Sequence, residues 1–219
     1  MSRLVIFGAG DIARLAHFYF TRDSPHDVAG FAVDRRFRSS DRFLELPLVD
    51  AEDMTVHFPP AEFDMFVAMS YAKINRPRAE KYARAKAAGY RMASYVSSHC
   101  TYLSQTPPGD NCFILEDNTV QPFVTIGNNV TLWSGNHIGH DSTIEDHCFI
   151  ASHVVVSGHV RIESQSFIGV NATLRNGITI GARSVVGAGA VIMKDTKPSS
   201  VFLGERAKLF AKSSDEIDL

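Results

Sequence analysis

The sequence is poor in cysteine and tryptophan, has no long apolar run and carries almost no net charge. Its three cysteines lack Cys-x-x-Cys spacing, which argues against a disulfide framework or a zinc knuckle. No apolar run approaches the roughly 18 residues of a membrane span, and the opening MSRLVIFGAG lacks the features of a signal peptide. With 22 Lys and Arg against 24 Asp and Glu, no general basic surface exists for nucleic acid or an anionic membrane. We therefore expect reduced thiols, a cytoplasmic location and a small-molecule partner.

The second half contains a six-residue repeat of aliphatic side chains. The period holds for fourteen consecutive hits: Ile114, Val120, Ile126, Leu132, Ile138, Ile144, Ile150, Val156, Ile162, Ile168, Leu174, Ile180, Val186 and Ile192. Neither a helix nor an alternating strand requires this period, whereas a triangular β-solenoid with six residues per side does. The repeat therefore predicts a parallel β-helix with three hexads in each 18-residue coil.

Other positions of the hexads fit the corners and the interior of this prism. Pairs such as Asn128-Asn129, Ser134-Gly135 and Asn176-Gly177 tolerate tight turns and stand where the chain must change direction. Asn118 and Asn136 occupy inward positions 18 residues apart, so we expect their side chains to stack in neighbouring coils and to hydrogen-bond to each other.

The first half has the pattern of a small α/β domain. We expect strands at 3–7, 27–33, 63–69 and 91–96, and helices from about residue 11 to 20 and over 76–88. Gly8-Ala9-Gly10 joins the first strand to the first helix, and Asp34 follows the second strand, as in a dinucleotide-binding fingerprint. A unit this short has no room for a second mononucleotide half. We therefore expect the glycine turn to hold one nucleotide's phosphates at a helix N-terminus.

Five motifs resemble those of the hexapeptide-repeat sugar acetyltransferases. They are FGAGDIA at 7–13, FAVDRR at 31–36, AMSYAKINR at 68–76, IGHDSTI at 138–144 and VFLGERAK at 201–208. The chain is similar over nearly its whole length to the sialic acid O-acetyltransferase and to enzymes that N-acetylate nucleotide-linked 4-amino sugars. The resemblance implies a left-handed β-helix, acetyl-CoA as cosubstrate, no metal, a homotrimer and a role in bacterial surface polysaccharide synthesis, such as that of O-antigen.

The expected fold is thus an α/β half-Rossmann (βαβαβ) domain followed by a left-handed parallel β-helix. We expect the nucleotide-sugar-binding domain at 1–95, the β-helix acyltransferase domain at 96–195, and a C-terminal cap and tail at 196–219. The N-terminal domain and the segment after Ile192 would cover the two open ends of the prism.

Acetyl transfer to an amine or hydroxyl needs a base that works near neutral pH, which is a role suited to histidine. His140 stands at a predicted corner and is followed by Asp141, so both side chains can project outward, and the carboxylate can orient the imidazole. Gly158 lies one coil further on and removes a side chain that would crowd the base. His159 lies one coil after Asp141 and is a competing partner for its carboxylate. No cysteine or serine pairs with a base, so we expect direct attack without an acetyl-enzyme.

The resemblance also implies binding residues. Those expected to contact the nucleotide sugar are Gly8, Gly10, Asp11, Asp34, Arg35, Ser70, Asn75 and Arg76. Those expected along the pantetheine of acetyl-CoA, in a groove between subunits, are Phe149, His153, Gly158, Val170 and Ala188. Phe149 stands where some relatives have a histidine, which puts one hydrogen bond to the cofactor in question.

The interpretation is an acetyl-CoA-dependent N-acetyltransferase for the amino group of a nucleotide-linked amino sugar. Sugar O-acetylation is the first alternative. A γ-type carbonic anhydrase uses the same helix with three zinc-binding histidines, but it needs no nucleotide-binding half. An NAD-dependent oxidoreductase would require a catalytic domain after the glycine turn, where the sequence has only a solenoid. A scaffolding solenoid would not need the outward pair His140-Asp141.

Overall fold

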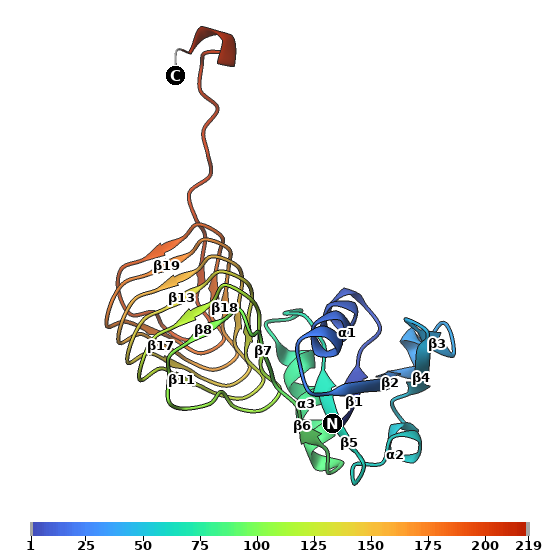
Figure 1. Ribbon diagram of the computed structural model, residues 1–219. Helices are drawn as coiled ribbons and strands as arrows, with labels where there is room; N and C mark the ends of the chain where they lie inside the picture. The colour runs from blue at the N-terminus through green and yellow to red at the C-terminus, as the bar shows by residue number, and fades with distance from the viewer. Residues whose placement is uncertain (1, 218–219) are drawn as a thin grey trace.

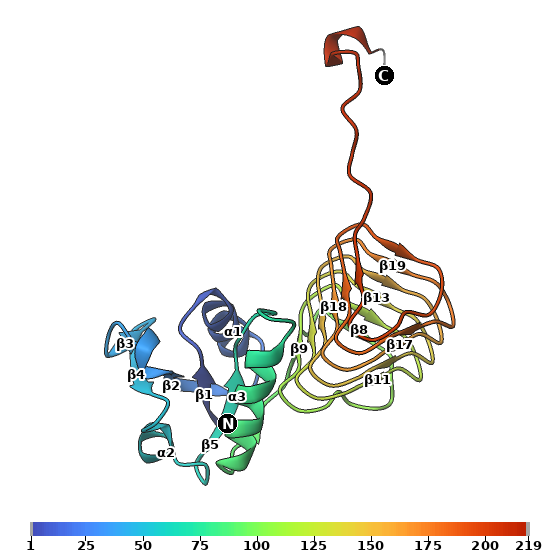
Figure 2. The ribbon, with the colours of Figure 1, turned by 180° about the vertical axis from the view of Figure 1, so that it is seen from behind.

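The structure, a computed structural model, describes residues 2–217 and has two parts that lie side by side (Figures 1 and 2). The α/β part runs from blue to green in Figure 1, and the β-helix from green to orange. The last residues leave the β-helix as an extended tail that ends in a short 3₁₀ turn, Ser214–Glu216. Among the described residues, no helix is long and apolar enough to cross a membrane.

The α/β part is built on one six-stranded sheet. Its order is β3 (Arg42–Phe43), β4 (Leu46–Asp50), β2 (Asp27–Val33), β1 (Arg3–Phe7), β5 (Phe63–Val67) and β6 (Arg91–Met92). All neighbours are parallel except β3 and β4. The helices are α1 (Asp11–Arg22), α2 (Met54–His57) and α3 (Arg76–Ala87), with a 3₁₀ turn at Arg35–Phe37. The half-Rossmann prediction is confirmed, and β3, β4 and α2 are additions that it lacked.

The single strand expected at 91–96 is two strands. Met92 ends β6 in the α/β sheet, whereas β7 (Tyr95–Val96) pairs with the first full coil of the β-helix. The chain changes sheets at Ala93-Ser94, and the Ser94 hydroxyl donates a hydrogen bond to the carbonyl of Gly109 at 2.8 Å. A stretch of six residues therefore serves two sheets, which the hydrophobic pattern alone does not reveal.

The β-helix has three parallel faces, each named here after one of its strands. The β15 face contains β7 (Tyr95–Val96), β9 (Phe113–Ile114), β12 (Thr131–Leu132), β15 (Phe149–Ile150), β18 (Phe167–Ile168), β21 (Val185–Val186) and β23 (Val201–Phe202). The β13 face contains β8 (Thr101–Tyr102), β10 (Thr119–Val120), β13 (His137–Ile138), β16 (Val155–Val156), β19 (Thr173–Leu174) and β22 (Val191–Ile192). The β14 face contains β11 (Thr125–Ile126), β14 (Thr143–Ile144), β17 (Arg161–Ile162) and β20 (Thr179–Ile180).

The register and the core of this prism follow from the hexads. Thr119 pairs with His137 and Phe149 with Phe167, so each coil advances the chain by 18 residues. All fourteen repeated aliphatic side chains are at most 5% exposed. The Asn136 side-chain amide donates to Asn118 Oδ1 at 2.9 Å, as the spacing predicted. Burial of this aliphatic stack, at about 25 cal/mol per Å² of apolar surface, is the main stabilising term of the prism.

The α/β part docks on the β15 face and reaches the two corners that flank it. Tyr95 and Phe113 share an apolar core with Phe20 and Phe66 of the α/β part. At one corner the Tyr19 hydroxyl donates to Glu116 at 2.8 Å. At the other flanking corner, between the β14 and β15 faces, α3 contacts the coils. The third corner, between the β13 and β14 faces, lies on the far side of the prism; we call residues 139–141, 157–159 and 175–177 the far corner.

A buried arginine on α3 makes the contact at the corner between the β14 and β15 faces. Arg78 is 2% exposed and donates to Thr131 Oγ1 at 2.8 Å and to the carbonyls of His147 and Cys148 at 3.0 Å each. Within residues 2–217, Arg78 forms no ion pair. Burial lowers the pKa of Arg78 to about 10. The guanidinium therefore joins α3 to the coils of the β-helix through hydrogen bonds.

Candidate active site

The glycine turn forms one wall of a pocket at the carboxyl edge of the α/β sheet. The pocket, of ≈ 340 Å³, is lined by Phe7, Gly8, Ala9, Gly10, Val33, Asp34, Phe37, Ala68 and Met69. Gly8 has φ +134°, and a Cβ there would lie 2.7 Å from the carbonyl oxygen of Ala68. Gly10 is the N-cap of α1, and nothing lies within 4 Å of where its Cβ would be. The turn thus presents bare backbone at a helix N-terminus, an arrangement suited to phosphate.

Asp34 lies in this pocket, at the end of β2, as its position in the sequence predicted. Its carboxylate accepts a hydrogen bond from the Lys81 ammonium of α3. That ammonium also lies 5.2 Å from the centroid of the Phe7 ring. Lys81 was not among the predicted residues, because a lysine on a helix is usually only a solvated surface charge. The pair places a carboxylate and a cation together at the rim of the pocket.

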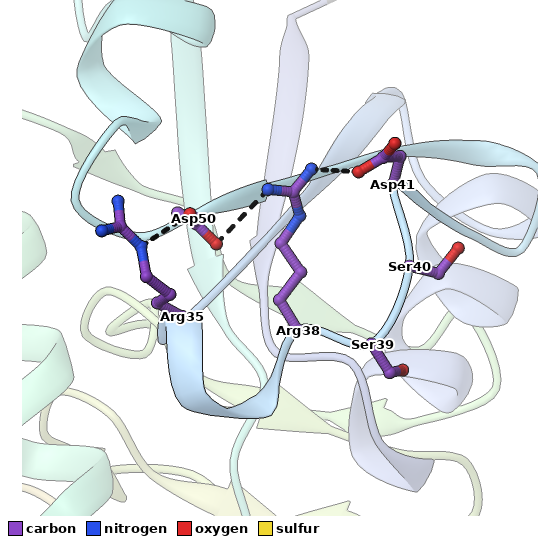
Figure 3. A pocket seen from close by; sticks show the side chains of 6 residues that line it. All are labelled: Arg35, Arg38, Ser39, Ser40, Asp41 and Asp50. Atoms are coloured by element: carbon purple, nitrogen blue, oxygen red, sulfur yellow. Dashed lines mark hydrogen bonds and ion pairs between the residues drawn. The ribbon is translucent and has the colours of Figure 1, made fainter.

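Arg35 points away from the glycine turn into a second pocket of ≈ 500 Å³, shown in Figure 3. Its Nε donates to Asp50 at 2.9 Å, which raises the pKa of Arg35 and keeps it charged. Arg38 lies on the other side of Asp50, 3.5 Å from it, and also donates to Asp41. Arg35 therefore belongs to an ion-pair cluster with Asp50 and lines a different pocket from Asp34, because consecutive residues at a strand end diverge. Its expected contact with the nucleotide sugar stays a prediction.

The segment between β5 and α3 contributes one buried residue and two exposed ones. Ser70 and Arg76 are exposed, whereas Asn75 is fully buried. The Asn75 side chain donates to the carbonyl of Ser166 at 3.2 Å, and its backbone φ is +61°. Asn75 thus fastens the segment to the β-helix. Since Asn75 has no exposed surface, the structure gives it a role in fixing this segment, and its expected contact with the substrate stays a prediction.

Asp11 is exposed and pairs with Arg14, 3.1 Å away, within the first turns of α1. It lies next to Gly10 but does not line the pocket of the glycine turn. A carboxylate at this helix N-terminus stabilises the helix through its dipole.

The far corner brings His140 and Asp141 together. Their side chains are half-exposed, and the distance from His140 Nδ1 to Asp141 Oδ2 is 2.7 Å. Asp141 has φ +58°, and this left-handed corner turns both side chains outward. The Gln121 side chain accepts a hydrogen bond from the His140 backbone N–H at 2.9 Å and secures the turn from the preceding coil. With a proton on Nδ1 directed at Asp141, the free electron pair of the imidazole is on Nε2.

Gly158 provides the space next to that electron pair. A Cβ at position 158 would lie 2.7 Å from His140 Nε2, so any other residue there would displace the imidazole. On the same corner, the His159 ring meets the His140 ring edge-to-face, with centroids 5.0 Å apart. Its Nε2 lies 3.9 Å from Asp141 Oδ2. Both neighbours were expected from the 18-residue spacing.

The residues expected along acetyl-CoA occupy two different corners of a single chain. His153, Val170 and Ala188 are exposed at the corner between the β15 and β13 faces, whereas Gly158 is at the far corner. These two corners border the β13 face on its two sides. His153 packs against Gly135: a Cβ at position 135 would lie 2.6 Å from the His153 ring. Within residues 2–217, His140 forms an ion pair with a carboxylate, whereas His153 does not.

Phe149 is 4% exposed and does not reach the surface. Tyr71 covers it with ring centroids 4.9 Å apart, and Phe167 stacks beside it at 5.9 Å. The hexad position predicted an outward side chain, which is correct, but the segment after β5 packs on it. The expected contact between Phe149 and the cofactor stays a prediction, and it would require Tyr71 to move off the Phe149 ring.

Comparisons with known proteins agree with this architecture. The family model "Bacterial transferase hexapeptide (six repeats)" matches residues 124–158, and "Hexapeptide repeat of succinyl-transferase" matches residues 159–194. These matches cover residues 124–194, so this part of the three-faced coil has the hexapeptide repeats of a left-handed β-helix.

Particular relatives extend the likeness. The PerB structure from Caulobacter crescentus, solved with CoA and GDP-perosamine, has a TM-score of 0.80 at 22% identity, covering 93% of this chain and 95% of that one. The acetyltransferase domain of PglB from Neisseria gonorrhoeae has a TM-score of 0.77 at 23% identity, covering 96% and 100%. These likenesses show that both parts of the chain share the fold of those proteins.

Among curated proteins, the acyl-[acyl-carrier-protein]–UDP-N-acetylglucosamine O-acyltransferase of Nautilia profundicola is 32% identical over 84 residues. The match covers 38% of this chain and 32% of the relative. The chain thus spans about a third of the length of that curated relative.

Proposed function

We propose that the protein is an acetyl-CoA-dependent N-acetyltransferase acting on the amino group of a nucleotide-linked amino sugar. The observation that carries the proposal is the half-exposed His140-Asp141 pair, with the His140 imidazole packed against Gly158, which has no side chain to displace it. The solved relatives with this fold include an acetyltransferase domain and a protein bound to CoA and GDP-perosamine.

The chemistry requires one base and no covalent intermediate. The sugar amine attacks the thioester carbonyl as His140 Nε2 accepts a proton from the amine. The C–N bond forms, the C–S bond breaks and the CoA thiolate takes up the proton from the imidazolium. Asp141 accepts the Nδ1–H, holds the ring in the required tautomer and stabilises its cation. Burial raises the pKa of Cys112 and of Cys148 to about 12, so neither thiol competes as a nucleophile.

The nucleotide would bind in the pocket of the glycine turn. Backbone N–H groups from Gly8 to the start of α1 would meet phosphate, and the Asp34 carboxylate would accept a hydrogen bond from a ribose hydroxyl. Lys81 adds a cation at the rim. Ser70 and Arg76 remain candidates for contacts with the distal phosphate or the sugar because both are exposed on the adjoining segment.

The separation of the two sites supports a homotrimer. The α/β part packs on the β15 face and contacts its two flanking corners at Glu116 and at His147, whereas His140 stands at the corner opposite that face. The prism therefore lies between the nucleotide pocket and the base of the same chain. A neighbouring copy can supply the His140 that a bound nucleotide sugar needs, with acetyl-CoA between the copies along His153, Val170 and Ala188 of one chain and Gly158 of the other. A monomeric mass by light scattering at assay concentration would contradict this arrangement.

The test is a screen of nucleotide-linked amino sugars with acetyl-CoA, followed by release of free thiol. We expect turnover with at least one amino sugar and none with the matching sugar that has a hydroxyl in place of the amine. Acetylation of the hydroxyl analogue at an equal rate would favour O-acetylation. Thiol release unaffected by His140→Ala, compared with a matched His137→Ala control on the neighbouring strand, would contradict the assignment of the base.

A further inference from the structure

His159 has no part in the acetyl transfer described above, although it stands against both residues of the pair. One donor atom each from His140, Asp141 and His159 lie within 4.8 Å of one another. The side chains are 50%, 42% and 56% exposed, so they can adjust without disturbing the core. We call these three side chains the far-corner triad. Among the described residues, they form a group of three metal-ligating side chains close enough to share one ion.

The spacing of the triad is close to what a tetrahedral ion requires. Bonds of about 2.0–2.1 Å to nitrogen and oxygen in a tetrahedral zinc site place neighbouring donors about 3.3 Å apart. In the triad, His140 Nδ1 is 2.7 Å and His159 Nε2 is 3.9 Å from Asp141 Oδ2. Each of these two distances has to change by about 0.6 Å, and the His140 and His159 nitrogens, which lie within 4.8 Å of each other, have to approach by up to about 1.5 Å. Side-chain rotation at an exposed corner supplies both changes.

The backbone beneath the triad is already fixed. The His159 N–H donates to the carbonyl of His140 at 2.8 Å, and both Asp141 and His159 have φ near +57° to +58°. The two turns therefore repeat the same geometry in adjacent coils, and Gly158 lacks the side chain that would push the His140 ring out of the triad. Water can fill the remaining coordination position from the open side.

We propose that the far-corner triad binds a divalent transition-metal ion of the zinc class and that this ion silences the catalytic base. Two imidazole nitrogens and one carboxylate oxygen are donors that suit Zn²⁺, Ni²⁺ or Cu²⁺ better than Mg²⁺ or Ca²⁺, which prefer oxygen. The ion is an inhibitor and not a cofactor, and the silencing step rests on the proposed acetyl transfer.

The loss of base activity follows from the number of free electron pairs on the imidazole nitrogens. A neutral imidazole has one nitrogen with a free electron pair and one that carries a proton. Whichever nitrogen of His140 binds the ion uses that pair, so the other nitrogen keeps its proton and cannot accept one from a substrate amine. The ion also takes the Asp141 carboxylate that would stabilise the imidazolium. Base catalysis and metal binding are therefore mutually exclusive at this corner.

Binding is tested on the untagged protein without substrates. Zn²⁺ is titrated by calorimetry, and Co²⁺ is used as an optical probe of tetrahedral coordination. We expect one ion per chain, with affinity reduced by about tenfold or more in His159→Asn and in Asp141→Asn. His137→Asn, on strand β13 beside the triad, is the matched control and should bind as the unmodified protein does. Unchanged affinity in His159→Asn, or no saturable binding of either ion, would overturn the site.

Silencing is tested separately in the acetyl-transfer assay. Zn²⁺ should lower the rate, a chelator should restore it, and His159→Asn should need about tenfold more Zn²⁺ for the same fractional loss relative to its own metal-free rate. Bound Zn²⁺ that leaves the rate unchanged would overturn the silencing step alone. If no acetyl transfer occurs with any sugar, the proposed function fails while the binding experiment still decides the metal site.

Discussion

Replacing Arg78 tests whether a buried, carboxylate-free guanidinium holds the two parts of the chain together. Arg78→Met keeps the length and apolar volume of the stem but removes hydrogen bonds to Thr131 Oγ1, Asn75 Oδ1 and the carbonyls of His147 and Cys148. Bonds from a charged donor are worth about 1.5–3 kcal/mol each. Three of the four come from Nη2, which has two protons, so the four count as about three full bonds and contribute about 6 kcal/mol.

Part of that gain offsets the cost of burying the charge. The pKa of Arg78 falls from 12.5 to about 10, which corresponds to a burial cost of about 3 kcal/mol. The net loss on substitution is therefore about 3 kcal/mol, within the range found when one partner of a buried polar contact is removed. Arg78→Lys should recover only part of it, because one ammonium cannot reach acceptors on three sides.

Urea unfolding followed by circular dichroism measures this loss. Arg84→Met, at an exposed position on the same helix, is the control and should change the free energy of unfolding by less than about 0.5 kcal/mol. A loss below about 1 kcal/mol in Arg78→Met would refute the reasoning, since the four bonds would then be no stronger than the cost of burial.

Three further outcomes are expected. His140→Ala should lower kcat by about 10²–10⁴-fold with little change in the affinity for either substrate, measured by steady-state kinetics; near-normal turnover would refute the role of the base. Gly8→Ala, where the Cβ would meet the Ala68 carbonyl at 2.7 Å, should raise the KM for the nucleotide sugar and leave that for acetyl-CoA unchanged; equal weakening of both would place the nucleotide elsewhere. Burial lowers the pKa of His147, so the unfolded chain binds more protons below about pH 6.5, and stability should fall as the pH drops through that range. In His147→Asn the fall between pH 7.5 and 5 should be smaller, and an identical fall would assign the effect to other groups.

The hexads predicted the β-helix because its side chains obey a strictly local rule. Each position of the six has one environment, so the aliphatic residues from Ile114 to Ile192 reveal the strands, the corners and the 18-residue coil together. The outward pair His140-Asp141 and the gap at Gly158 followed from the same rule. In the α/β part, Pro47 and the short segments around it gave no clear period, which is why β3 and β4 were missed.

The remaining site depends on contacts between segments distant in the sequence. Phe149 looks like an outward-facing residue until Tyr71 packs over it, and Lys81 looks like a surface charge until α3 brings it to Asp34. Arg35 follows Asp34 directly, yet the two side chains enter different pockets. Spacing rules cannot supply such information, because it arises only when α3 and the segment before it dock on the coils.

The pocket of the glycine turn and His140 lie on opposite sides of the prism, and under the proposed function this has a consequence for mixtures of defective chains. One chain with an obstructed turn, Gly10→Trp, and one without the base, His140→Ala, are each inactive as pure assemblies. When they are unfolded together and reassembled at random, about a quarter of the junctions join an intact pocket from one chain to an intact histidine from its neighbour. Two inactive preparations would thus yield an active mixture, whereas a site contained within one chain would stay inactive in every combination.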